Sequence, residues 1–364
     1  MIKKIIKILC ICLGSIIFVL VGYISYIMIQ YSRIEDNLSY KDSIYNNQQE
    51  IIQVSNTYDV ITYNIGFGAY TQDFSFFMDS GKMLDGSVVK GKYGKSFSKE
   101  DTLNNTNGVI SILEEYNTDF MLLQEVDTKS SRSYKINQFA LIKEKLSLHS
   151  SVHVSNFHTA YLFYPFNDPH GLSNSGIATF SKYQINDVIR KSLEVTDSLI
   201  SKFFDLDRCF SVTYIPTSDN KELVLINVHL SAYDEGGVYR KKQWKQLTDF
   251  MQNEYDKGNY IVCGGDFNHD IAGSLNYFET KQEVPEWVYV LSNDDLNDNF
   301  SFATSKNAPT CRSTDMPYEK GVNYTVVIDG FIVSKNIKVE KILNIDTDFK
   351  YSDHNPVYLE FSFN

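Results

Sequence analysis

Most of the chain consists of short apolar runs separated by polar segments, and apolar residues recur at helical spacing in only a few places. Apolar runs of this length, rich in β-branched and aromatic residues, are typical of buried strands. We predict strands at 59–63, 120–123, 175–180, 222–228, 260–263, 326–333 and 356–363. Helices are predicted at 102–116, 137–146 and 239–255. Asp101 is a candidate cap for the first helix. Strands outnumber helices, which indicates an α/β fold with mixed connections.

The N-terminal residues break this pattern. Residues 8–30 contain no charged side chain, and at about 1.5 Å per residue a helix of this length crosses a hydrocarbon core of ~30 Å. Three lysines precede the run, so the positive-inside tendency predicts a single-pass protein of the cell membrane with its body outside. A cleaved signal peptide is the alternative, but it would end in small residues, where this chain has Tyr23 and Tyr26. We therefore expect residues 1–30 to form a retained anchor.

The remainder divides by composition into a polar stalk and a body. Residues 31–56 are rich in Asn, Gln, Ser and Asp and predict the stalk, and residues 57–364 predict one catalytic domain. Residues 69–99 form a long insertion, which in compact domains is usually functional or mobile. Five scattered cysteines show no metal-site spacing, so those of the body are expected to be small core residues.

Charge limits the class of partner. The first 33 residues carry four basic and no acidic side chains, so the remaining 30 basic and 45 acidic residues give the rest of the chain a net charge of −15. A body of this charge offers no electrostatic surface for gripping a long polyanion without help from metal ions.

Candidate chemistry centres on residues 259–270, Asn-Tyr-Ile-Val-Cys-Gly-Gly-Asp-Phe-Asn-His-Asp. The apolar run predicts a buried strand, and Gly264 and Gly265 allow a sharp turn and a close approach of the backbone. Asp266 and Asn268 then follow at the end of the strand. Taken alone, this pattern is also typical of an ordinary turn, because Asp and Asn often bond to their own backbone.

The turn interpretation weakens because other predicted strands also end in reactive side chains. These are Asn64, Glu125 and His229. Strand ends on one side of a layered α/β protein share an edge, where ligands bind. Each residue alone could be a solvated terminus or a satisfied histidine.

Two more candidate groups lie in the C-terminal part. Asp329 interrupts the apolar stretch 326–333, where a carboxylate is costly unless paired, and His354 is the natural partner. Asp353 adjoins this histidine. Hard oxygen ligands of this kind select Mg²⁺, with Mn²⁺ or Ca²⁺ as alternatives, over zinc. A divalent ion, an Asp that deprotonates water and an Asp-held imidazolium together predict a metal-assisted phosphoester hydrolase.

The motifs around these residues occur in a specific order. They are Tyr63-Asn64, Gln124-Glu125, Ser175-Gly176-Ile177-Ala178 with Ser181-Lys182, Asn227-Val228-His229, Gly265-Asp266-Phe267-Asn268, Ile328-Asp329 and Ser352-Asp353-His354-Asn355-Pro356. This set resembles the endonuclease/exonuclease/phosphatase (DNase I-like) superfamily, which includes nucleases, abasic-site endonucleases, neutral sphingomyelinases and inositol polyphosphate 5-phosphatases. The resemblance covers residues 58–363 and suggests a membrane-anchored, bacterial-type member.

The resemblance implies a four-layer α/β sandwich, in which two packed mixed sheets are flanked by helices, and it implies roles for the site residues. Metal ligation is implied for Glu125, Asn64 and Asp353. The catalytic set implied is Asp266 as the water-orienting base, Asn268 on the phosphate, His354 steered by Asp329, and His229 as the second histidine. DNase I-like enzymes carry a glutamate near Ser175-Gly176 to steer that histidine, and this chain has none there.

These expectations combine into a membrane-tethered, Mg²⁺-dependent phosphoesterase that hydrolyses a phosphodiester or a phosphomonoester. A lipid headgroup or small phosphodiester is the favoured substrate, because the body is acidic and the stalk keeps the site near the bilayer. Two alternatives are an extracellular DNase I-like nuclease and a non-catalytic binding module on the same fold. The presence of Glu125, Asp266 and His354 favours an enzyme.

Overall fold

Two mixed β-sheets form the centre of the computed structural model, which describes residues 2–30, 32–195, 207–232 and 237–364. In spatial order, the seven-stranded sheet contains β1 (Leu38–Ser39), β8 (Asp187–Ser192), β9 (Cys209–Pro216), β10 (Glu222–His229), β11 (Tyr260–Asp266), β17 (Asp329–Ser334) and β14 (Phe300–Ala303). The six-stranded sheet contains β18 (Ile337–Asn344), β19 (Val357–Phe363), β2 (Thr57–Asn64), β5 (Phe120–Asp127), β7 (Asn174–Ser181) and β6 (Ser150–His158).

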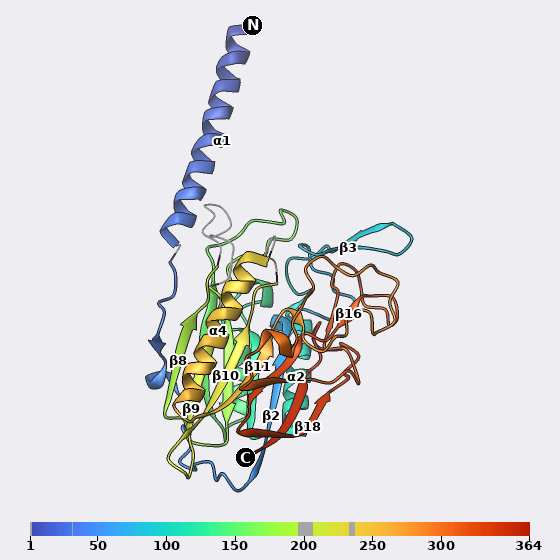
Figure 1. Ribbon diagram of the computed structural model, residues 1–364. Helices are drawn as coiled ribbons and strands as arrows, with labels where there is room; N and C mark the ends of the chain where they lie inside the picture. The colour runs from blue at the N-terminus through green and yellow to red at the C-terminus, as the bar shows by residue number, and fades with distance from the viewer. Residues whose placement is uncertain (1, 31, 196–206, 233–236) are drawn as a thin grey trace.

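Helices cover the outer faces of both sheets. The covering helices are α2 (Lys99–Tyr116), α3 (Gln138–Lys145) and α4 (Val238–Asp256), whereas α1 (Ile2–Gln30) lies outside the sandwich. Leu247 and Met251 of α4 pack on the seven-stranded sheet, while Val109 of α2 and Ile142 of α3 pack on the six-stranded sheet. The predicted four-layer α/β sandwich is therefore confirmed, with α4 lying across the strands β8 to β11 (Figure 1).

Three small two-stranded sheets among the described residues are separate from the two large sheets. They are β3 (Ser80–Lys82) with β4 (Val88–Lys90), β12 (His269–Asp270) with β13 (Tyr289–Val290), and β15 (Cys311–Arg312) with β16 (Thr325–Val326). The first ladder belongs to the insertion 69–99, whose own aromatic residues, Phe74 among them, pack into a separate cluster. This insertion is therefore a packed substructure and not an open loop.

Several predicted elements differ in detail. Ser98, and not Asp101, caps α2: its hydroxyl accepts a hydrogen bond from the Asp101 backbone N–H, and it donates one to the Asp101 carboxylate. The strand predicted at 326–333 is split into β16 and β17, so Asp329 begins a strand instead of interrupting one.

The N-terminal helix projects away from the sandwich (Figure 1). Among the described residues, α1 is the one helix long and apolar enough to cross a membrane. Residues 32–56, predicted as a polar stalk, run along the domain where they are described. β1 pairs with β8, and the Ile52 side chain is fully buried between the sheets.

Strand direction brings the polar strand ends to one edge. β10 and β11 run parallel, and β17 runs antiparallel to β11, so His229, Asp266 and Asp329 lie side by side in register. In the other sheet β2 and β5 are parallel and place Asn64 beside Gln124, next to Glu125. Neighbours in register project from the same face of a sheet. Both sheets therefore present these side chains at a shared edge.

The glycine pair before Asp266 serves close packing. A Cβ on Gly264 would lie 2.5 Å from the Phe331 ring and 3.0 Å from Leu122 of the other sheet. Gly265 has φ +152°, and a Cβ there would lie 2.0 Å from the Val228 carbonyl oxygen. Only glycine fits at either position, which lets β11 deliver Asp266 between the sheets.

Phe331 tests the inter-sheet packing because its side chain is fully buried between the two sheets. We expect Phe331→Ala to lower the free energy of unfolding by about 3–5 kcal/mol, through lost burial and the cavity left behind. Phe166→Ala is the matched control, because the Phe166 side chain is 85% exposed. Urea unfolding of the full chain in detergent measures both changes, and equal stability of the two variants would contradict this account of the core.

Candidate active site

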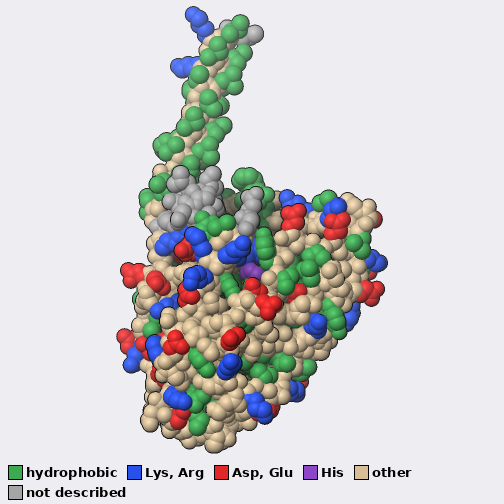
Figure 2. Space-filling model, in the orientation of Figure 1, with side chains coloured by type: hydrophobic (Ala, Val, Ile, Leu, Met, Phe, Trp, Pro, Cys, Tyr) green, Lys and Arg blue, Asp and Glu red, His purple; other side chains and the backbone are tan. Residues whose placement is uncertain are grey.

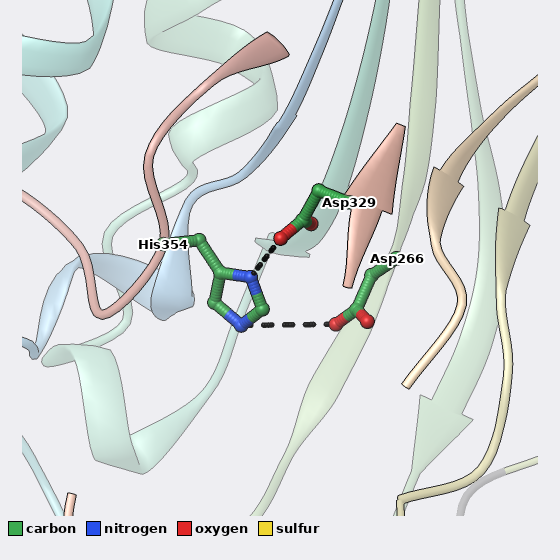
Figure 3. A group of neighbouring side chains, drawn as sticks. All are labelled: Asp266, Asp329 and His354. Atoms are coloured by element: carbon green, nitrogen blue, oxygen red, sulfur yellow. Dashed lines mark hydrogen bonds and ion pairs between the residues drawn. The ribbon is translucent and has the colours of Figure 1, made fainter. Parts of the chain in front are cut away.

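An acid–imidazole–acid chain forms the centre of the site. His354 Nδ1 lies 2.8 Å from Asp329 Oδ2, and His354 Nε2 lies 3.7 Å from Asp266 Oδ2 (Figure 3). All three side chains are buried. The predicted pairing of Asp329 with His354 is therefore present in the structure. Because a carboxylate at Nδ1 fixes the tautomer, Nε2 of His354 faces Asp266 and the cleft.

Hydrogen bonds to the backbone fix the position of Asp329. Thr310 Oγ1 accepts hydrogen bonds from the backbone N–H groups of Ile328 and Asp329, at 2.9 and 3.0 Å. Residue 311 forms an isolated β-bridge with His354. These contacts hold the start of β17 against the loop that carries the histidine.

Asn64 links the Asp329–His354–Asp266 group to Glu125. Its Nδ2 donates to Asp266 Oδ2 at 3.0 Å and to Glu125 Oε1 at 3.3 Å, while its Oδ1 accepts from the Gly66 backbone N–H. Asn64 thus acts as a clamp between the two carboxylates in this arrangement.

Glu125 sits in an unusual backbone conformation. Its φ is +55°, and the pairing of β5 with β7 shifts register between Leu123 and Val126. A bulge of this kind re-aims a side chain and is frequent beside active sites. Here it places the carboxylate 4.0 Å from His229 Nε2. The prediction of a strand ending at Glu125 missed this bulge, because β5 continues to Asp127.

Burial sets the protonation of the acidic groups. Burial, together with the neighbouring Asp353, raises the pKa of Glu125 to about 7. Burial also raises the pKa of Asp266 to about 6, with Asp329 acting in the same direction and His354 against it. The raised pKa values of these two neighbouring carboxylates indicate that too little positive charge lies nearby to stabilise both in the ionised form.

Burial acts in the opposite direction on the pKa of His354. Its burial alone would lower its pKa, but Asp329, Cys311 and Asp266 outweigh that effect and hold the pKa well above the ordinary value. Asp266, Asp329 and His354 each offer an atom within 4.8 Å of the others, which is compact enough for a metal ion. A protonated imidazole has no lone pair to offer, so we interpret this set as a proton relay and not as the metal centre.

A divalent cation fits better beside Glu125. The carboxylate of Asp353 helps to raise the pKa of Glu125, so a positive partner at this place would be favourable. The two carboxylates supply hard oxygen ligands, which suit Mg²⁺ or Mn²⁺, and the Asn64 amide would add a third by turning its oxygen, here bonded to the Gly66 N–H, toward the cation. The donor set is therefore consistent with the metal ligands expected from the sequence.

His229 and Asn268 complete the predicted set. His229 Nε2 lies 3.5 Å from Asp266 Oδ2, and burial with the nearby Arg208 lowers its pKa well below the ordinary value. Among the described residues none accepts a hydrogen bond from its Nδ1, in agreement with the missing glutamate. The Asn268 backbone N–H donates to Asp266 Oδ1, and its side chain donates to the Leu230 carbonyl, so its contacts here orient the Asp266 carboxylate.

The sequence interpretation missed Arg132. It forms two hydrogen bonds with Asp127, at 2.9 and 3.1 Å, and its guanidinium lies 3.8 Å from the centre of the Phe67 ring. Its charge lowers the pKa of Glu125. The signal was available, since a basic residue in a Ser-rich loop follows the strand that carries Glu125.

Most of these groups open into one large cavity, whereas Asn64 and Asp329 are not part of its lining. Its volume is about 1400 Å³, and its lining includes Glu125, His229, Asp266, Asp353 and His354. Arg132 and Arg312 are buried in the same wall. The arrangement offers a base, an acid and cationic groups around a space that accepts a phosphoester.

Solved structures share this architecture. The chain is similar to zebrafish (D. rerio) TDP2 complexed with a single-strand DNA product, with 12% identity, 84% of this chain and 99% of that chain covered, and a TM-score of 0.53. It is similar to the catalytic domain of human Nocturnin, with 14% identity, 85% and 94% coverage, and a TM-score of 0.53. It is also similar to a family protein from Leptotrichia buccalis C-1013-b, with 13% identity, 84% and 100% coverage, and a TM-score of 0.53.

A comparison with the sequences of curated proteins finds no match. Residues 61–354, however, match the sequence model of the Endonuclease/Exonuclease/phosphatase family. This range begins in β2 and ends at His354, so it contains every residue assembled at the sheet edge. The chain belongs to the Endonuclease/Exonuclease/phosphatase family, whose members are metal-dependent phosphoester hydrolases and nucleases.

Proposed function

We propose that this protein is a membrane-tethered phosphoesterase that uses Mg²⁺ or Mn²⁺ to direct water onto phosphorus. The observation that carries this proposal is the contact of His354 with Asp329, 2.8 Å from Nδ1 to Oδ2, with Asp266 facing the other nitrogen of the ring. A base and an imidazolium that share one cleft are the proton-handling groups that ester hydrolysis needs.

The reaction divides between these groups. Ionised Asp266 takes a proton from water, whose oxygen bonds to phosphorus while the bond from phosphorus to the leaving oxygen breaks. The imidazolium of His354, which Asp329 holds in orientation, stabilises the developing negative charge on the phosphoryl oxygens. Asn64 keeps the Asp266 carboxylate oriented. The departing oxygen takes up the proton that Asp266 removed from water, so the products are a phosphate-bearing fragment and an alcohol.

The metal would be held by Glu125, Asn64 and Asp353. When bound, a divalent cation polarises a phosphoryl oxygen. It would also supply positive charge beside Glu125, whose raised pKa supports this placement.

The location follows from the N-terminal helix. We propose that α1 remains attached as a single membrane span with the body on the outer side. Support comes from its length and composition, from the lysines that precede its apolar stretch, and from Tyr23 and Tyr26 near its C-terminal end.

Metal dependence is tested at Glu125. We expect Glu125→Gln to lower Mg²⁺ affinity by about 10- to 100-fold or more. Losing a residue that only hydrogen-bonds to a metal ligand already lowers metal affinity by that factor, and Glu125 would be a ligand itself. Turnover should fall with it, because the amide lacks the charge of the carboxylate. Calorimetric titration with Mg²⁺ and hydrolysis of bis-p-nitrophenyl phosphate measure the two effects. Glu340→Gln, on an exposed residue, is the control, and full activity in excess EDTA would refute the metal requirement.

The pH profile tests the proton relay. Turnover should rise as pH passes about 6, where Asp266 becomes ionised, and should fall only at a pH well above 6.5, where His354 loses its proton. Asp329→Asn removes the charge that raises the His354 pKa, so the falling limb should move to lower pH. Turnover should drop by about 100-fold or more.

Asp249→Asn, an exposed residue of α4, serves as the control for this substitution and should keep the wild-type profile. An unchanged rate and an unmoved falling limb in Asp329→Asn would exclude the relay.

A further inference from the structure

The C-terminal end of α1 is fixed to the rim of the active-site cavity. The Tyr23 hydroxyl donates to the Tyr161 carbonyl oxygen at 3.1 Å, and the Tyr26 hydroxyl accepts from the Tyr161 backbone N–H at 3.1 Å. The Tyr23 ring meets the Phe163 ring edge-on, with centroids 5.4 Å apart. Two hydrogen bonds to one peptide residue and a ring contact place the segment 161–166 beside the helix.

This segment exposes large aromatic side chains. Phe163, Tyr164 and Phe166 are 51%, 59% and 85% exposed. The Tyr164 ring lies 6.1 Å from Phe166 and 5.6 Å from Phe77, so the group is contiguous. We name Phe163, Tyr164 and Phe166 the aromatic rim. Exposed apolar residues are ordinary when scattered, but a contiguous group marks an interaction surface.

The insertion extends this surface on the same cavity. Met78 and Val88, on either side of the β3–β4 turn, also line the cavity and are 58% and 74% exposed. In the space-filling view hydrophobic side chains gather beside the foot of α1, above a hollow in which a histidine is visible (Figure 2). The apolar surface and the opening of the site thus lie on the side that faces α1.

The helix identifies the occupant of this surface. Tyrosines at the end of an apolar span lie at the membrane–water interface, where one end of the ring is apolar and the other wet. If α1 spans the bilayer, Tyr23 and Tyr26 lie at that depth, and so does the segment 161–166 that they contact. The aromatic rim then meets lipid headgroups and the upper acyl chains.

The same cavity joins the rim to the reacting groups. Its lining contains the exposed Phe163 and Phe166 as well as the buried Asp266 and His354. A phosphoester that enters past the rim reaches the base and the imidazolium without leaving the membrane surface. The buried Arg132 and Arg312 in the wall suit the negative charge of its phosphate.

We propose that the aromatic rim docks in the interface of the bilayer that α1 spans, and that the substrate is the phosphoester of a lipid headgroup in that bilayer. This inference rests on the proposed phosphoesterase function of the site, and it adds the substrate class and the surface that presents it. Hydrolysis adds the hydroxyl of water to phosphorus and its proton to the departing oxygen, and it needs no other reactant.

Docking is tested without reference to activity. The full chain is reconstituted in phosphatidylcholine–phosphatidylglycerol vesicles with p-benzoylphenylalanine in place of Phe166, and in a second sample in place of Tyr277. Tyr277 is 59% exposed and lies outside the cavity lining, so it is the matched position. On illumination we expect about tenfold more lipid adduct at 166 than at 277, as burial of one aromatic side chain predicts. Equal adducts, or adducts at 166 to a second copy or another protein, would overturn docking on lipid.

The substrate class is tested by turnover on vesicles relative to turnover on soluble bis-p-nitrophenyl phosphate. We expect this ratio to fall about tenfold in Phe163→Ser with Phe166→Ser, and to keep its wild-type value in Tyr277→Ser with Val290→Ser. Plasmid nicking without lipid hydrolysis would overturn the lipid substrate. Failure on every phosphoester together with lipid adducts at 166 would count against the phosphoesterase and leave the docking surface standing.

Discussion

The burial of Asp329 against His354 is the interaction on which the site depends. A carboxylate fully enclosed between two sheets is strongly destabilising unless an opposite charge meets it, and the imidazolium 2.8 Å away supplies that charge. The pair in turn fixes the direction of the histidine ring. Because Thr310 and the strand pairing hold both partners, the histidine faces Asp266 as a consequence of the fold.

Topology supplies the remaining groups. Parallel neighbours end at the same edge, and antiparallel neighbours begin there, so strands from distant parts of the sequence bring Asn64, Glu125, His229, Asp266 and Asp329 to one edge. The glycine pair in β11 lets the two sheets approach closely enough for Asn64 of one sheet to bond Asp266 of the other. Sheet packing and catalytic geometry thus have a common origin.

Much of this architecture could be predicted from the sequence because the signals are local. The apolar run before Asp266 predicted β11, and the resemblance of the ordered motifs to a known superfamily implied the sandwich. Other features could not be predicted in this way. The bulge at Glu125 depends on register with β7, and the capping of α2 by Ser98 depends on where the chain enters the helix. The packing of residues 32–56 on the sheet depends on an edge strand two residues long.

The aromatic rim shows a different limit. Its residues are visible in the sequence as an aromatic cluster, but only the fold places them beside the foot of α1 and on the cavity of Asp266. Residues 23 and 163 are far apart in the sequence, so no local pattern predicts that they are in contact. A surface of this kind becomes interpretable once the helix and the site are seen to share one side of the molecule (Figures 1 and 2).

The central claim is that buried carboxylates hold His354 in its protonated form, and NMR titration of the imidazole nitrogens measures this directly. The signal of His354 is assigned by its loss in His354→Gln, with the protein free of Mg²⁺. We predict an imidazolium at neutral pH that releases its proton only well above the ordinary histidine value of 6.5. A His354 ring that is neutral at pH 7, or that titrates at or below the ordinary value, would contradict the account.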